Sequence, residues 1–119
     1  MEEVILECKA ANFVGIERVE ETGLRRIIPT VRGMGNCRLD SQGLRFVQFI
    51  SKREIFIPID KIIDVSLGWW HAGKFKGVKL LKVVYWTGEE KLSVGFRLNI
   101  RAKNTIKWKE KIEELKKTA

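Results

Sequence analysis

The sequence predicts a mainly β domain of about seven short, mostly antiparallel strands, closed by a single carboxy-terminal helix. The strongest support is the pair of apolar segments VKLLKVVYW (78–86) and KLSVGFRL (91–98), which the turn TGEE joins as in a β-hairpin. The second support is the final segment NTIKWKEKIEELKKTA (104–119), whose apolar residues repeat at helical spacing. The 119 residues, 45% of them hydrophobic, suffice for one domain with an apolar core, and we assign residues 1–119 to it.

Four further segments are predicted strands: 4–13, which mixes apolar and polar residues as a half-buried strand does, 35–40, 44–50, and 53–59, a nearly continuous apolar run that ends at Pro58. The second and third are separated by SQG and form a predicted hairpin. Segment 60–68 is either a strand or begins with one helical turn capped by Asp60. Within 23–32, Pro29 confines any strand to a sheet edge, because proline donates no backbone hydrogen bond.

Alternation within 91–98 predicts which side chains of this strand face the core. Successive side chains of a strand point to opposite faces, so one set is expected to be buried and the other to face water. The expected buried set is Leu92, Val94, Phe96 and Leu98, and the expected wet set is Lys91, Ser93, Gly95 and Arg97.

The terminal helix is expected to cover 104–117. Trp108, Ile112 and Leu115 follow one another at i, i+4 and i+7, which gives the helix one narrow apolar stripe. Asn104 is a suitable amino-terminal cap. A helix with a single apolar stripe covers one open end of a larger β structure. The side chain of Trp108 is large enough to fill such an opening.

Several short motifs resemble those of the pleckstrin-homology (PH)-like superfold, in particular its GRAM-like and prokaryotic PH-like domains. They are GNCRLDSQGLRF (35–46), IPIDKIIDVSLG (57–68), VGF (94–96) and the lone Trp108 early in the helix. Their order carries the resemblance, which extends over roughly residues 4–117. It implies a barrel of two near-orthogonal antiparallel sheets with one open end capped by the helix. The long charged segment 16–33 departs from the short hairpin usual in that family.

Positive charge is concentrated in the second half of the chain. Residues 1–60 carry nine basic and nine acidic side chains, whereas residues 61–119 carry fourteen and six, which accounts for the whole net charge of +8. A one-sided positive field favours anionic partners such as lipid headgroups, nucleic acid or an acidic protein surface, or else serves solubility alone.

Compartment and redox state are suggested by what the sequence lacks. No apolar run reaches the roughly 20 residues of a membrane-spanning helix, and the acidic start MEEVILECKA differs from a secretory signal. We therefore expect a cytoplasmic protein, peripheral at the inner membrane face if it binds lipid.

Cys8 and Cys37 lack C-x-x-C spacing, so we expect small buried thiols and no disulfide.

No catalytic motif is recognisable, and we expect a binding module without cofactor, metal or small-molecule substrate. The single histidine, His71, has no second histidine with which to share a metal. RGMGNCR (32–38) has an arginine where a dinucleotide-binding loop requires its third glycine. Neither a nucleophile elbow nor a Walker-type phosphate loop is present.

The segment GWWHAGKFKGVKLLK (68–82) is the predicted binding site. It is expected to form a rim loop in which three lysines meet anionic headgroups while neighbouring aromatic residues settle at interfacial depth. The lysines are Lys74, Lys76 and Lys79, and the accompanying residues are Trp69, Trp70, His71 and Phe75.

Three alternatives remain for this segment. Gly68, Gly73 and Gly77 allow a turn that only covers the barrel, and in that case Trp69 and Trp70 should differ in exposure, because neighbours on a strand face opposite ways. Single-stranded nucleic acid is disfavoured, since the helix lysines lie among glutamates and no ribonucleoprotein-type aromatic motif occurs. An acidic protein partner could instead use a strand edge or the groove beside the helix. The sequence does not specify an oligomeric state.

Overall fold

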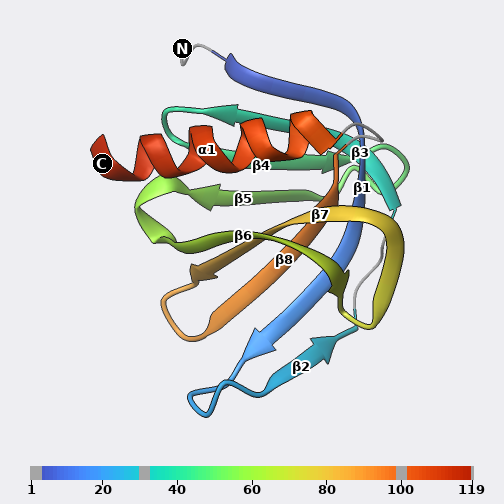
Figure 1. Cartoon of the computed structure of the whole chain (residues 1–119), viewed down its shortest axis with the longest axis vertical. Helices are drawn as coiled ribbons and strands as arrows, with labels where there is room; N and C mark the ends of the chain where they lie inside the picture. Colours follow the sequence, from blue (N-terminus) through green and yellow to red (C-terminus); the bar gives the residue numbers. More distant parts are fainter. Residues whose placement is uncertain (1–3, 30–32, 99–101, 119) are drawn as a thin grey trace.

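The computed structural model describes residues 4–29, 33–98 and 102–118, and within these ranges the side chains of 70, 74–78 and 102–104 lie outside the description. One antiparallel sheet of eight strands curves around an apolar core, and helix α1 lies across one end of it (Figure 1). The strands are β1 (Val4–Val19), β2 (Arg25–Ile28), β3 (Gly33–Asp40), β4 (Gly43–Gln48), β5 (Glu54–Pro58), β6 (Ile62–His71), β7 (Lys74–Trp86) and β8 (Lys91–Arg97). A 3-10 turn, η1 (Ile59–Lys61), precedes β6, and α1 is Ala102–Thr118.

The long strand β1 joins the two halves of the sheet. The strand order is β5-β4-β3-β1-β8-β7-β6, and β2 pairs with β1 outside this path. The first part of β1 pairs with β3 from Val4 to Phe13, and the later part pairs with β8 from Asn12 to Arg18. Consecutive hairpins therefore extend from both sides of one bent strand, which confirms the predicted PH-like barrel with a carboxy-terminal helix.

The predicted hairpins β3–β4 and β7–β8 are confirmed. Within the segment 16–33, β1 continues to Val19 and β2 returns along it until Ile28, and residues 30–32 lie outside the described residues. Proline follows the last paired residue, where its missing N–H costs no ladder hydrogen bond.

Two predicted caps are wrong. The helical turn before β6 begins at Ile59, one residue before Asp60, and follows Pro58 without a side-chain hydrogen bond. Helix α1 begins at Ala102, so Asn104 lies inside its first turn instead of capping it. In both places the backbone enters the helical conformation before the polar residue that the sequence suggested as its cap.

The core and the helix stripe follow the prediction. The rings of Phe13, Phe46 and Phe96 meet at centroid distances of 5.2 to 5.8 Å. Trp108, which is 4% exposed, and Ile112 belong to the same cluster, and Leu115 packs against it. The helix rests mainly on β6 and β7 and so covers the open end of the core.

The second face of β8 contradicts the expected alternation. Val94, Phe96 and Leu98 are buried and Leu92 is partly buried, as predicted. Ser93 and Gly95 are buried too, although both were expected to face water. On the neighbouring strand β7, Leu80 and Val84 are likewise buried on the face opposite the core residues Leu81 and Val83. The outer face of β7 and β8, opposite the core, is therefore covered by other parts of the chain.

Candidate functional site

The predicted rim loop is a tight hairpin. Strand β6 continues to His71 and β7 begins at Lys74, so only Ala72 and Gly73 form the turn. Their φ angles are 51° and 78°, and positive φ at both central residues is the type I′ geometry that matches the twist of a two-residue hairpin. The expectation of a rim loop over 68–82 is therefore wrong, because apart from Ala72 and Gly73 these residues belong to β6 or β7.

His71 fastens this hairpin to the outer face of the sheet. Its side chain is 1% exposed, and Nε2 donates to the carbonyl oxygen of Gly15 at 2.8 Å. Nδ1 lies 3.3 Å from Oε1 of Glu17, without the geometry of a hydrogen bond. The other carboxylate oxygen of Glu17 accepts the N–H of Ala72 at 3.2 Å. The hairpin tip at the end of β6 is thus bonded to β1, and these two strands are not neighbours in the sheet.

A glycine on β8 makes room for the imidazole. Gly15 on β1 and Gly95 on β8 are register partners. A Cβ atom on Gly95 would lie 2.5 Å from Cγ and Cδ2 of the His71 ring, so only glycine permits this approach. The hairpin tip also reaches β2, since a Cβ on Gly73 would lie 3.2 Å from Cδ1 of Ile27.

Burial lowers the pKa of His71 below its ordinary value, and this effect exceeds the opposing attraction of Glu17 and the hydrogen bond to Gly15. The neutral ring with its proton on Nε2 therefore fits the site. Lys82 lies on the same face, half-buried, and burial together with Arg25 lowers its pKa. Neither His71 nor Lys82 is placed as an exposed cation for a bound anion.

A pH dependence follows for the hairpin anchor. A folded-state pKa below the unfolded value of about 6.5 means that the unfolded chain binds the extra proton more readily, so this part of the stability is lost as pH falls below about 6.5. We expect Tm to fall more between pH 7.5 and about 5 in the wild-type chain than in His71→Gln, whose amide donates a similar bond but does not titrate. Equal falls in Tm would show that His71 does not titrate across this range.

The predicted binding residues are placed as follows. Trp69 is 47% exposed and Lys79 is exposed, both near the β6–β7 hairpin tip. His71 is buried and does not belong to an exposed binding surface. Four predicted side chains lie outside the described residues, so the expected contrast between the two tryptophans stays a prediction: those of Trp70, Lys74, Phe75 and Lys76.

A second exposed feature was missed in the sequence. The turn between β4 and β5 presents Ile50 with 99% of its side chain exposed and Phe49 with 43%. Met34, also exposed, lies beside them, because its carbonyl accepts the N–H of Phe49 at 3.1 Å. Lys52 and Arg53 follow directly and are exposed. The sequence pattern that indicates this surface is FISKR (49–53), in which the apolar end of a strand leads into basic residues. The predicted strand 44–50 includes Phe49 and Ile50, whereas β4 ends at Gln48.

This β4–β5 turn is held in a defined shape. The N–H of Gln48 donates to the carbonyl of Arg53 at 2.9 Å, and the Ser51 hydroxyl donates to Oε1 of Gln48 at 2.5 Å. Lys52 adopts a φ of 60°, which closes the turn. In Figure 1 the β4–β5 turn and the β6–β7 hairpin both lie on the right-hand side of the view.

The part of the chain that the structure describes holds neither a metal-type cluster nor a membrane-spanning helix. Over 4–29, 33–98 and 102–118, no three His, Cys, Asp or Glu side chains gather as a metal site would require. Helix α1 is the one helix of this described part, and it is not apolar enough to cross a membrane. Cys8 and Cys37 are register partners with free thiols, and burial strongly raises the pKa of Cys37.

Comparison with known proteins places this architecture in a family. None of the curated proteins compared with the chain matches it. Residues 18–113 match the family described as bacterial PH domain-like, a range that begins near the end of β1 and continues into α1. Because this match covers most of the sequence, and the strand order and terminal helix agree with it, the chain belongs to the bacterial PH domain-like family.

Proposed function

We propose that this chain is a non-catalytic binding module of the cytoplasm that attaches to anionic membrane surfaces. PH-like domains are typically binding modules, and family membership supports that general role. The observation that carries the membrane proposal is Ile50, which is 99% exposed on a turn held by hydrogen bonds and is followed by two basic residues. A fixed turn that keeps a large apolar side chain in water is suited to entering the interfacial region of a bilayer.

The β6–β7 hairpin supplies the second contact of the proposed attachment. Trp69 is amphipathic and partly exposed, and aromatic residues of this kind prefer the depth of lipid headgroups. Lys74, Lys76 and Lys79 follow within ten residues, and no acidic residue occurs between Asp64 and Glu89. Each lysine near an anionic leaflet contributes about 1 kcal/mol, so the hairpin alone gives weak and salt-sensitive binding. Insertion of Ile50 and Phe49 would strengthen it.

Sedimentation with vesicles tests this proposal. We expect binding to vesicles that contain phosphatidylglycerol, little binding to phosphatidylcholine alone, and a decrease at high salt. Changing Lys74, Lys76 and Lys79 together to Glu should weaken binding on the order of 100-fold and flatten its salt dependence. Ile50→Asp should weaken binding but leave the salt dependence, because it removes an apolar contact and not a cation.

Matched controls separate position from composition. Ile106→Asp makes the same change at a half-exposed isoleucine of α1, and changing Lys107, Lys111 and Lys117 to Glu makes the same charge change on the helix. Both controls should retain most of the vesicle binding. If the hairpin triple variant binds vesicles like the wild type, the hairpin is a cover for the sheet and the proposal fails. Tighter binding to single-stranded RNA than to vesicles, lost in the same triple variant, would reassign the surface to nucleic acid.

A further inference from the structure

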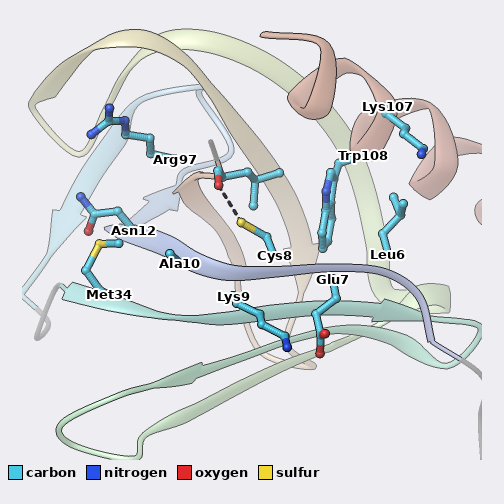
Figure 2. Close-up of a pocket in the computed structure, with 11 residues that line it drawn as sticks. Leu6, Glu7, Cys8, Lys9, Ala10, Asn12, Met34, Arg97, Lys107 and Trp108 are labelled. Carbon is cyan, nitrogen blue, oxygen red and sulfur yellow. Dashed lines mark hydrogen bonds between the residues drawn. The ribbon is translucent and has the colours of Figure 1, made fainter. Parts of the chain in front are cut away.

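A groove of about 640 Å³ lies between the first half of β1, the end of β8 and the first turns of α1 (Figure 2), and at Met34 it adjoins the exposed residues of the β4–β5 turn. It is lined along β1 by the five consecutive residues 6–10. Successive side chains of a strand point to opposite faces, so a hollow that touches all five runs along the edge of the strand. At about 3.3 Å per residue, this stretch is about 13 Å long.

That edge of β1 has no strand partner among the described residues. The strand β8 pairs with β1 only from Asn12 onward, whereas β3 pairs with the opposite edge from Val4. In this stretch Leu6, Glu7 and Cys8 pair with β3 on one side only, and a register shift between Cys8 and Ala11 leaves Lys9 and Ala10 without a β3 register partner. An unpaired strand edge is a template for an additional strand.

The walls of the groove are apolar at the centre. Trp108 stands beside Cys8 in Figure 2, and Leu98 also lines the groove. The Cys8 thiol donates to the carbonyl oxygen of Leu98 at 2.6 Å, which fixes its position. Leu6 extends this surface along β1. Such a surface can accept the apolar side chains of an added strand.

The charges around the groove are predominantly positive. Glu7 is engaged by Arg38, whose Nη2 lies 3.1 Å from its carboxylate. Lys9, Arg97 and Lys107 have no carboxylate partner within the part of the chain that the structure describes. Arg97 and Lys107 lie toward opposite ends of the groove in Figure 2.

We propose that this groove binds an extended acidic peptide segment of a partner protein, which adds as a strand to the free edge of β1. Its backbone would pair with residues 6–10, one apolar side chain would lie against Trp108, and its carboxylates would meet Arg97 and Lys107. A second copy of this chain is a poorer occupant, because it would bring the same three cations against them. A lipid acyl chain cannot supply the hydrogen bonds that the strand edge requires.

Selection from a displayed library of random dodecapeptides against the whole chain identifies the probe. We expect the enriched peptides to be acidic and to lack proline. Acidic and apolar residues should alternate along their sequences. The best of them, synthesised with a fluorescent label, should lose at least about tenfold in affinity when Arg97 and Lys107 are both changed to Glu. N-methylation at alternate backbone positions of the peptide should abolish binding for one of the two positional sets, because only one set donates to β1.

The control for charge is the double change Lys61→Glu and Lys117→Glu, which should leave the affinity unchanged. Circular dichroism should show the same Tm for Arg97→Glu/Lys107→Glu and wild type, since both side chains are at least partly exposed. Failure to enrich any acidic peptide would overturn the proposal, as would enriched peptides that bind the double variant equally well. Because this test uses neither the hairpin lysines nor Ile50, its outcome is independent of the membrane proposal.

Discussion

Trp108→Ala is expected to lower the free energy of unfolding by about 3 to 5 kcal/mol, as other truncations of large core aromatic residues do. The indole is 4% exposed and belongs to the apolar cluster of the barrel, although it comes from the helix. Removing it leaves a cavity where α1 meets the sheet, and within the described residues α1 is held mainly by its packing on β6, β7 and η1. Urea denaturation followed by circular dichroism measures the effect.

A neighbouring residue of the same helix is the control for this change. Ile106→Ala removes a side chain that is 44% exposed, and we expect it to cost less than about 1 kcal/mol. If Trp108→Ala also costs less than about 1 kcal/mol, the helix does not close the core. Because Trp108 also lines the groove beside β1, peptide binding should be weakened under conditions where the variant is still folded.

Gly95→Ala is expected to destabilise the protein by about 1 to 3 kcal/mol through overpacking. The added methyl group would lie 2.5 Å from two ring atoms of His71, and the ring is buried and bonded to Gly15, so it cannot move aside cheaply. The strain should be relieved by lifting the β6–β7 hairpin tip, which breaks the bonds from His71 and Ala72 to β1. Denaturant unfolding measures the loss.

A double-mutant cycle with His71→Ala isolates the contact. His71→Ala alone loses the anchor, but in its background the methyl group at position 95 meets no ring. We therefore expect the double variant to be less destabilised than the sum of the single variants, by about 1 kcal/mol or more. Additive losses would show that the imidazole does not rest on Gly95.

Local patterns in the sequence were sufficient to identify the core-facing side of two elements, β8 and α1. The alternation in 91–98 identifies the inward side chains of β8, since strand geometry repeats every two residues. The spacing of Trp108, Ile112 and Leu115 likewise identifies the buried stripe of α1, since a helix repeats every 3.6 residues. The order of short motifs was enough to indicate the PH-like fold, which the family match confirms.

Such local patterns do not predict contacts between residues that lie far apart in the sequence. His71 stands in a lysine-rich stretch and was grouped with the exposed residues, but it lies against Gly15, which is 56 residues away in the sequence. The groove beside β1 has a similar origin, because it depends on where β8 stops pairing and where α1 begins. The sequence by itself determined the elements and their inward faces, because these depend on local periodicity. Only the tertiary structure decided that the second face of β8 is covered and that one edge of β1 lacks a strand partner within residues 4–29, 33–98 and 102–118, because both depend on how strands far apart in the sequence align.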